Sequence, residues 1–377
     1  MTQRDLHNLP LFNDDHPQEE RLDEIVRLDV EVILQILEKW KKAITLTKLR
    51  LVTSDFKNAL MDSHHKIHVN ASCRNFVEFS RNYLLDEIEQ IATSLTVERG
   101  LYYVDRLIKS VTEIRTSSVN DINLNRWKEY EDILTDSLWL MDRRDSSGVH
   151  TAGYWGNFIP QIPNQMMKRY TKKGDWVLDT FAGSGTTLIE GQRLGRNSLG
   201  IELQSRMVDQ AKKLVAAEPN KHEVVIDVVE GDSVTTDYKA LLEKYGQKSV
   251  QLVIMHPPYF DIIKFSDDNR DLSNATSIDG FLEMMGAIIE NASKVLDKGR
   301  YLVIVIGDKY SKGDWIPLGF QTMNEALKRG FSLKSIIVKN FEDTSGKRNQ
   351  KKLWRYRALV GGFYIFKHEY VFLLRKQ

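Results

Sequence analysis

The stretch "DWVLDTFAGSGTTLIEGQRLG", residues 175–195, decides the fold class of this 377-residue chain. A short apolar run ends at Asp179, and two glycines, Gly183 and Gly185, precede an amphipathic segment. Glycines permit a tight strand-to-helix turn and let the backbone approach a ligand at the positive end of the helix. The turn lacks the Gly-Lys-Ser/Thr ending of a P-loop and is not a GxGxxG dinucleotide turn. It therefore predicts the first strand, turn and helix of an α/β sheet.

Short apolar runs alternate with amphipathic segments from about residue 150 onward, which is typical of a parallel α/β sheet. The runs are DWVLDTF, NSLGIEL, EVVIDVVEG, VQLVIM, RYLVIVIGD, SLKSIIVKN and EYVFLLRK. Residues 341–367, between the last two runs, have no clear helical period, and we expect them to return as a hairpin arm. We therefore predict a seven-stranded, Rossmann-like α/β sheet whose last strand is antiparallel.

The N-terminal third of the chain has a different pattern. Residues 1–20 are polar, and helical spacing of apolar residues follows within residues 21–145. The helical stretches are RLDEIVRLDVEVILQILEKWKKAI, NFVEFSRNYLLDEIEQIATSL and NRWKEYEDILTDSLWLMDRR. We expect a polar tail at 1–20, a helical module at 21–145 and an α/β domain at 146–377.

The composition is that of an ordinary soluble globular protein, with 42% apolar and 28% charged residues. A single cysteine, Cys73, excludes an internal disulfide and a thiolate metal site, which fits a cytoplasmic location. No apolar run approaches the length of a membrane span, and the N-terminus does not resemble a signal peptide. Because the net charge is only +1, a polyanionic partner must be argued from local clusters of charge.

Polar residues follow three further runs of the predicted sheet. Glu202 lies about twenty residues after the glycine turn, where an acid commonly accepts hydrogen bonds from ribose hydroxyls. Asp232 follows the third run, and the fourth ends in "HPPY", residues 256–259. Two consecutive prolines form a rigid, extended segment, and open α/β sheets bind ligands at the carboxyl ends of their strands. The alternatives are a solvated acid at 202, a helix cap at 232 and a proline-terminated strand leading into a loop.

From about residue 136 the chain resembles the S-adenosylmethionine-dependent DNA amino-methyltransferases, which modify adenine N6 or cytosine N4. FAGSGTT resembles the family's cofactor turn, HPPY its Asp/Asn/Ser-Pro-Pro-Tyr/Phe catalytic motif, and YWGNFIPQIPNQMMKRYTKKGDWVLD the segment that precedes the first strand. The motif order is that of a non-permuted member. The resemblance implies catalytic roles for His256, Pro257, Pro258 and Tyr259. It implies cofactor binding by Asp179, Phe181, Ala182, Gly183, Gly185, Thr186, Glu202 and Asp232.

In such a site the amino group would donate one N–H to His256 and one to the carbonyl of Pro257. Tyr259 would stack on the extruded base, because a target atom inside a duplex is out of reach. His256 departs from the family's usual Asp, Asn or Ser. Neutral imidazole has one acceptor nitrogen and imidazolium has none, so we expect activity to fall on acidification toward the pKa of His256. The departure leaves the target base, adenine or cytosine, open.

A basic and aromatic segment, GKRNQKKLWRYR at 346–357, favours contact with nucleic acid over a merely solvated edge. The residues that we expect to bind DNA are Lys264, Lys347, Arg348, Lys351, Lys352, Trp354, Arg355 and Arg357. The helical module is the main candidate for reading the target sequence, and its alternative role is dimerisation.

The sequence therefore predicts a DNA methyltransferase with S-adenosylmethionine as cofactor and double-stranded DNA as partner. A restriction–modification setting implies a cognate restriction endonuclease, although an orphan enzyme is the alternative, and the chain would be a monomer or homodimer. Other relatives with proline-proline shelves methylate RNA or protein glutamine. A further alternative is a non-catalytic nucleic-acid-binding subunit whose shelf lost activity through the histidine substitution.

Overall fold

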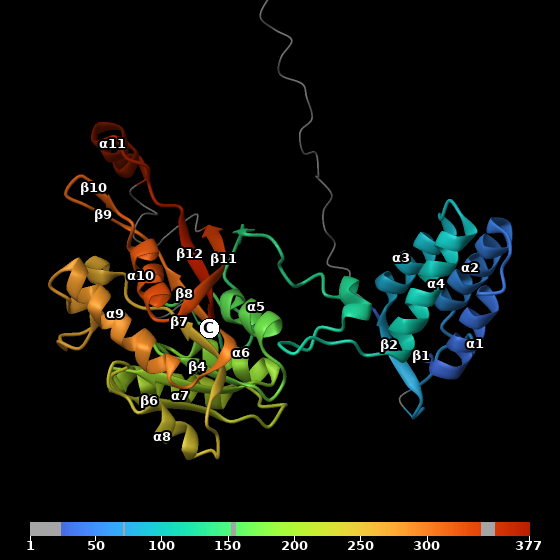
Figure 1. The fold of residues 1–377 in the computed structure, drawn as a ribbon, viewed down its shortest axis with the longest axis horizontal. Coiled ribbons are helices and arrows are strands. Elements are labelled where there is room, and N and C mark those ends of the chain that lie inside the picture. The colour runs from blue at the N-terminus through green and yellow to red at the C-terminus, as the bar shows by residue number, and fades with distance from the viewer. Residues whose placement is uncertain (1–23, 71, 152–155, 341–350) are drawn as a thin grey trace, which may run out of the picture. The chain divides into compact units, whose positions relative to one another are not determined.

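The computed structural model describes residues 24–70, 72–151, 156–340 and 351–377, without the side chain of Lys351 (Figure 1). The chain divides into two compact units. The N-terminal unit extends to Arg115 and includes Asn123–Tyr130, and the sheet unit comprises Thr116–Ile122 and Glu131–Gln377. The boundary at 145 that we expected from the sequence lies inside the sheet unit.

The N-terminal unit packs four helices with a two-stranded antiparallel ribbon. The strands are β1 (Ile25–Asp29) and β2 (Phe76–Ser80), and the helices are α1 (Val30–Trp40), α2 (Leu46–Met61), α3 (Arg81–Ala92) and α4 (Val97–Thr112). Each helix begins at a side chain that accepts a backbone N–H of its first turn: Asp29, Thr45, Ser80 and Thr96. One buried apolar cluster draws on all six elements, so this unit has a core of its own.

All three stretches that we expected to be helical differ in the structure. In the first, residues 25–29 form β1 before α1 begins. Residues 76–80 form β2 before α3 begins, and only the 3₁₀ helix Leu124–Glu129 forms within residues 125–144. The apolar side chains of the latter stretch do not share one buried face, because Trp127 is 60% exposed whereas Trp139 is buried in the sheet unit. The stretch instead runs extended and supplies β3 (Leu138–Trp139), which pairs with the edge of the sheet.

The sheet unit contains an eight-stranded sheet in the order β3-β11-β12-β8-β7-β4-β5-β6. The strands besides β3 are β4 (Trp176–Asp179), β5 (Asn197–Glu202), β6 (Ile226–Glu230), β7 (Val250–Met255), β8 (Leu296–Ile306), β11 (Phe331–Asn340) and β12 (His368–Lys376). Only β12 is antiparallel to its neighbours. The predicted α/β sheet with an antiparallel last strand is thus confirmed, with β3 as an eighth, two-residue strand.

Helices cover both faces of this sheet. On one face lie α5 (Gln161–Tyr170), α6 (Thr186–Leu194) and α7 (Ser205–Ala217), and on the other α8 (Tyr238–Glu243), α9 (Ile278–Ser293) and α10 (Leu318–Lys328). Successive strand residues serve opposite faces, so Val177 packs with Met166 of α5 while Leu178 packs with Met285 of α9. Because helices bury both faces of the sheet, a ligand can bind only at the ends of the strands.

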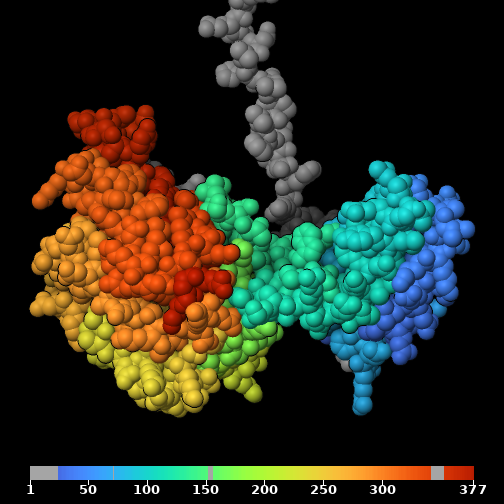
Figure 2. Space-filling model, in the orientation of Figure 1, coloured from blue at the N-terminus to red at the C-terminus, as the bar shows by residue number. Residues whose placement is uncertain are grey.

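We expected a hairpin arm at 341–367, and the structure describes residues 351–367 of this segment. Residues 351–361 form helix α11 (Lys351–Gly361), because half-buried Trp354 and Ala358 repeat at the spacing of one helical face. Residues 341–350 lie outside the described residues. A hairpin that we did not predict lies earlier, in β9 (Lys309–Ser311) and β10 (Asp314–Ile316), around left-handed Lys312 and Gly313. In Figure 2 the red residues of α11 stand out from the orange surface of this hairpin region.

Candidate active site

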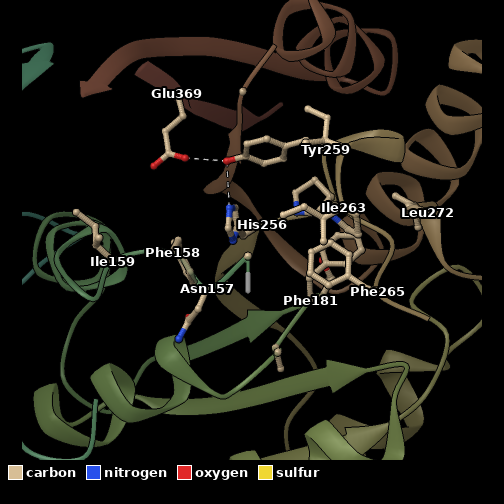
Figure 3. Close-up of a pocket in the computed structure, with 18 of the residues that line it drawn as sticks. Asn157, Phe158, Ile159, Phe181, His256, Tyr259, Ile263, Phe265, Leu272 and Glu369 are labelled. Atoms are coloured by element: carbon tan, nitrogen blue, oxygen red, sulfur yellow. Dashed lines mark hydrogen bonds between the residues drawn. The ribbon is translucent and has the colours of Figure 1, made fainter. Parts of the chain in front are cut away.

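A cavity of about 1140 Å³ opens at the carboxyl ends of β4, β5, β6 and β7 (Figure 3). This volume exceeds the range of roughly 300 to 1,000 Å³ that is usual for the pocket of one small molecule, so a cofactor and a second ligand fit together. The predicted site residues that line it are Phe181, Ala182, Gly183, Glu202, Asp232, His256, Pro257, Pro258, Tyr259 and Trp354. The cofactor turn and the HPPY shelf therefore share one cavity.

The glycine turn after β4 depends on backbone angles that favour glycine. Gly183 has φ of 50° and Gly185 has φ of 87°, and Gly185 is the N-cap of α6. A Cβ at Gly185 would lie only 3.3 Å from the Cβ of Ala211. The amide of Gly183 donates to Oε2 of Glu202 at 2.9 Å, which joins the turn to the end of β5. Gly183 thus lies at the cavity, whereas the absence of a side chain at Gly185 lets the turn pack against α7.

Glu202 and Asp232 project from neighbouring strand ends, and backbone amides orient both carboxylates. Glu202 accepts the amide of Gln204 on Oε1 at 2.9 Å in addition to that of Gly183. Burial raises the pKa of Glu202, although the two amide donors oppose this shift. Asp232 accepts the amide of Val234 at 2.9 Å and so stabilises the following turn, but it does not cap the next helix, because Asp237 is the N-cap of α8. A carboxylate has about four acceptor positions, which leaves both side chains able to accept from ribose hydroxyls.

Three other residues from the predicted cofactor set, Asp179, Gly185 and Thr186, lie behind the cavity wall. Asp179 is 1% exposed and accepts the amide of Phe181 at 2.8 Å. Burial raises its pKa to about 6, against hydrogen bonds that favour the charged form. Thr186 donates its hydroxyl to Oδ1 of Asn157 at 2.5 Å. These residues hold the turn in shape and do not face the ligand space.

Asn157 is a site residue that sequence reasoning missed. Its Nδ2 donates to Oγ of Ser184 at 2.9 Å and to the carbonyl of Thr151 at 3.1 Å, while its Oδ1 accepts from Thr186. Asn157 also lines the cavity, so it joins the segment upstream of α5 to the glycine turn. The segment resembled the family's approach to the first strand, but no residue spacing marked this asparagine.

Strained backbone and close packing support the HPPY shelf. Phe260, directly after it, has φ of 53°, a left-handed angle that is uncommon for a residue other than glycine. Its ring is buried, and the Nζ of Lys309 lies 4.5 Å from the ring centroid. The ring of Tyr259 packs against Gly307, where a Cβ would lie 3.0 Å from Cε2 of the tyrosine. The shelf is therefore held from β8 and from the β9 hairpin as well as by its prolines.

His256 faces this cavity and contacts two aromatic rings. Its Nε2 lies 3.1 Å from the hydroxyl of Tyr259, and its ring centroid lies 4.8 Å from that of Phe158. Burial lowers the pKa of His256 to about 4, which Glu369 opposes and Lys339 reinforces. Histidine is therefore neutral at neutral pH and keeps one acceptor nitrogen.

Behind the shelf, two charged residues meet on adjacent strands. The hydroxyl of Tyr259 donates to Oε2 of Glu369 on β12 at 2.8 Å (Figure 3). The Nζ of Lys339 on β11 lies 3.0 Å from Oε1 of Glu369. Sequence reasoning missed both, because they follow the shelf by about 80 and 110 residues and only the strand register brings them together.

Arg144 is a further lining residue that the sequence did not reveal. Its Nη1 donates to the carbonyls of Phe158 at 2.7 Å and Asn157 at 3.3 Å. Its Nε and Nη2 are buried and make no hydrogen bond with any described residue. Burial lowers the pKa of Arg144, although an arginine keeps its charge at any ordinary pH. The cavity wall thus holds a cation with unused donors.

The residues predicted to bind DNA lie in two places. On α11, Trp354 lines the cavity, the Arg357 guanidinium lies 5.3 Å from the Trp354 ring, and Lys352, Arg355 and Arg357 are exposed. Lys264 is exposed on the loop after the shelf and forms an ion pair with Asp267 at 2.5 Å. Lys347 and Arg348 lie outside the described residues, as does the side chain of Lys351.

A family profile matches most of this chain. The sequence profile of the family described as DNA methylase (N6_N4_Mtase) matches residues 22–213 and 250–377, which is more than half of the chain. The chain belongs to this family. Membership confirms the resemblance inferred from the sequence and S-adenosylmethionine as the cofactor.

Individual relatives match over shorter regions. The chain is 33% identical over 113 residues to the type II methyltransferase M.MjaII of Methanocaldococcus jannaschii, covering 27% of this chain and 21% of that protein. It is 34% identical over 100 residues to the type II methyltransferase M2.DpnII of Streptococcus pneumoniae, and the match covers 25% of this chain and 34% of that protein. It is 30% identical over 138 residues to a probable tRNA (guanine(10)-N2)-dimethyltransferase of Methanothermococcus thermolithotrophicus. This match covers 37% of this chain and 74% of that protein. The chain thus spans about a fifth to a third of the first two relatives.

The cavity fits the chemistry of S-adenosylmethionine. Acceptor carboxylates at Glu202 and Asp232 suit hydroxyl and amino donors, and Phe181 and Leu272 offer apolar surface for an adenine ring. Gly183 of the left-handed turn lines the cavity and presents no side chain to it. Among the described residues, no helix combines the length and the apolar character that a membrane crossing requires.

Proposed function

We propose that this protein transfers a methyl group from S-adenosylmethionine to an exocyclic amino group, adenine N6 or cytosine N4, of a base extruded from double-stranded DNA. One observation carries the proposal: the carboxylates suited to the cofactor and the HPPY shelf line the same cavity. A methyl donor and an amine acceptor must meet in one enclosed space for direct transfer. The match to the DNA methylase family favours DNA as the acceptor.

The cofactor side of the cavity holds the donor. Glu202 would accept from ribose hydroxyls and Asp232 from the adenosine, while Phe181, Ala182 and Gly183 form the wall beside them. Asp179, Gly185 and Thr186 support that wall from behind. When bound, S-adenosylmethionine supplies a methyl group that the charge on its sulfonium activates.

The shelf orients the acceptor. An exocyclic amine is a poor nucleophile because its lone pair is delocalised into the base. His256 would accept one N–H and the carbonyl of Pro257 the other, so that the nitrogen pyramidalises and its lone pair turns toward the methyl group. Pro258 keeps the two acceptors rigid relative to each other. Tyr259 would contact the extruded base with its ring.

Positive charge beside the cavity mouth suits the phosphates that flank an extruded base. Arg144 offers buried donors that have no partner among the described residues, and Lys352, Arg355 and Arg357 are exposed on α11 next to Trp354. Lys264, Lys347, Arg348 and Lys351 belong to the same proposed surface. The N-terminal unit is proposed to read the target sequence or to form a homodimer. Two of the relatives named above are type II methyltransferases, which supports a restriction–modification setting with a cognate endonuclease.

Methyl transfer from tritiated cofactor tests this function. The purified full chain is incubated with tritiated S-adenosylmethionine and duplex DNA, transfer RNA and total protein as separate acceptors. We expect label in DNA, and long-read sequencing of that DNA then names the base and its sequence context. The matched control is Glu202→Ala, which removes a cofactor contact and leaves the shelf. Label in protein alone, or cofactor binding without transfer to any acceptor, would contradict the proposal.

RNA is the second candidate acceptor because one relative is a probable tRNA methyltransferase and the chain spans 74% of its length. The chemistry is related, since guanine N2 is also an exocyclic amine. The transfer RNA arm of the experiment separates the two acceptors. Label in RNA with none in DNA would favour this second candidate.

A further inference from the structure

The buried pair of Lys339 and Glu369 is an unusual feature of the sheet. The two residues face each other across β11 and β12, and they are only 5% and 8% exposed. A buried ion pair is weak evidence for stability, because desolvation of both charges opposes their attraction and apolar residues of similar size often serve as well. The pair lies directly behind the shelf, which indicates a role in the site.

The protons of this cluster can be assigned from its hydrogen bonds. Burial would raise the pKa of Glu369, but Lys339 and the hydroxyl of Tyr259 favour its charged form, so its pKa lies below its usual value and it is a carboxylate. A carboxylate only accepts, so the hydroxyl of Tyr259 must donate its single proton to Oε2 of Glu369. The same hydroxyl oxygen lies 3.1 Å from Nε2 of His256 and has only its lone pairs left. Nε2 must therefore carry a proton and donate it.

The assignment determines the other nitrogen of the ring. His256 is neutral at neutral pH and has one proton, which Nε2 already holds. Nδ1 is then an acceptor, and it has no hydrogen-bond partner among the described residues. The ring cannot turn freely, because Phe158 packs along it and Tyr259 meets it edge to face at 84°.

We propose that Lys339, Glu369 and the hydroxyl of Tyr259 are positioning residues that fix His256 as its Nε2–H tautomer, so that Nδ1 accepts an N–H of the substrate amine. The inference rests on the proposed function for the substrate, whereas the tautomer itself is a property of the free protein. Aspartate or asparagine offers an acceptor oxygen with no tautomer to fix. A histidine at this place needs the support that β11 and β12 supply.

Nitrogen NMR of the free full-length chain tests the tautomer without any activity. Histidine is labelled with ¹⁵N, and the resonances of His256 are assigned by their loss in His256→Asn among the nine histidines of the chain. We expect a protonated Nε2 and an unprotonated Nδ1, and Tyr259→Phe should shift both nitrogens toward an averaged value. A protonated Nδ1 in the wild-type protein would overturn the proposal.

Kinetics test whether the tautomer matters for transfer. Tyr259→Phe keeps the ring and removes the hydroxyl, so we expect kcat to fall roughly tenfold with KM unchanged, which corresponds to the loss of one hydrogen bond. In a His256→Asn background the same change should have little effect, since an amide has no tautomer to fix. Equal losses in both backgrounds would assign the hydroxyl a merely structural role and overturn the proposal.

A matched control is available in the turn after α8. Tyr245 also donates to a carboxylate, Asp227, at 2.7 Å, and it does not line the cavity. Tyr245→Phe should leave the His256 resonances and kcat unchanged. If the wild type labels no acceptor while its NMR spectrum shows the expected tautomer, the proposed function fails and the tautomer assignment stands. If His256→Asn is inactive, the kinetic comparison cannot be made, and the NMR spectra alone test the tautomer of His256.

Discussion

The hydroxyl of Thr186 donates to Oδ1 of Asn157 at 2.5 Å, which joins the first turn of α6 to the segment before α5. The amide nitrogen of Asn157 also donates to Ser184, so one side chain holds two residues of the glycine turn. The turn that should carry the cofactor therefore depends on a residue about 30 positions upstream.

Asn157→Ala removes these hydrogen bonds, and we expect the Kd for S-adenosylmethionine to rise roughly tenfold or more, since the absence of each bond weakens the turn. Calorimetric titration of the cofactor measures the change. Asn220→Ala is the control, because the side chain of Asn220 bonds to the backbone of Val224 in an exposed loop away from the cavity. An unchanged Kd in Asn157→Ala would mean that the turn keeps its shape without this side chain.

The pKa of His256 sets the pH range of activity. An ordinary histidine would gain its proton near pH 6.5, but burial lowers the pKa of His256 to about 4. The charged groups that face it are Glu369, which raises the pKa, and Lys339, which lowers it. We expect its protonation to leave kcat unchanged from pH 8 to about 5.5 and to lower kcat only as the pH approaches 4.

Comparison with His256→Asn isolates that ionisation. The ratio of wild-type kcat to variant kcat should stay constant from pH 8 to about 5.5 and fall below it, because only the wild type loses an acceptor. Stopped assays of tritium transfer give both profiles. A ratio that already falls near pH 6.5 would show that His256 has an ordinary pKa and is open to water.

The sequence predicts the parts of the site that lie within one strand-to-turn stretch. The glycine turn, Glu202 and the HPPY shelf each follow an apolar run directly, and parallel strands necessarily end at one edge of the sheet. The order of motifs along the chain is therefore enough to predict that the glycine turn, Glu202 and the HPPY shelf lie together. The antiparallel last strand was likewise visible as a separate apolar run at the C-terminus.

The residues that sequence reasoning missed reach the site through distant pairings. Glu369 stands behind Tyr259 only because β12 inserts between β8 and β11 in one register, and a shift of one residue would turn its side chain to the other face. Arg144 is marked by its buried donors, which only the fold reveals. The prediction of a helix at 125–144 was wrong because the apolar residues of this stretch pack in different places, including β3.

Asp179 should make stability depend on pH. Burial raises its pKa in the folded chain to about 6, from about 3.8, so the folded state binds the proton more tightly than the unfolded state. Stability is then highest when the carboxyl is protonated and falls as the pH rises through 6. Relative to Asp179→Asn, the wild type should lose about 2 kcal/mol between pH 4 and pH 7, most of it below pH 6.

Urea unfolding of both proteins without cofactor, followed by circular dichroism at several pH values, measures this difference. Asparagine can still accept the amide of Phe181, so the variant should fold. A difference in stability that stays constant across this range would show that Asp179 is ionised in the folded chain at all these pH values.

Gly307 gives the ring of Tyr259 its place. A Cβ at residue 307 would lie 3.0 Å from Cε2 and 3.3 Å from Cδ2 of that ring, and the backbone before it belongs to β8. We expect Gly307→Ala to displace the ring and lower kcat by about tenfold or more, with the Kd for the cofactor unchanged. The matched control is Gly280→Ala on α9, where an added Cβ would meet only Oγ of Ser277, at 3.2 Å. A normal kcat in Gly307→Ala would mean that the ring position does not limit transfer.

The exposed cations of α11 should contribute to DNA affinity through their attraction to phosphates. The triple variant Lys352→Ala, Arg355→Ala, Arg357→Ala removes three positive charges beside Trp354, and we expect weaker binding at every DNA sequence. The slope of log affinity against log salt should become shallower by about 0.9 for each phosphate that these cations neutralise in the wild type.

Fluorescence anisotropy with a labelled duplex at several salt concentrations measures both the affinity and its dependence on salt. The matched control is Lys239→Ala, Lys244→Ala, Lys248→Ala, which removes three exposed charges around α8, none of which lines the cavity. Equal slopes for the two triple variants would remove α11 from the DNA surface.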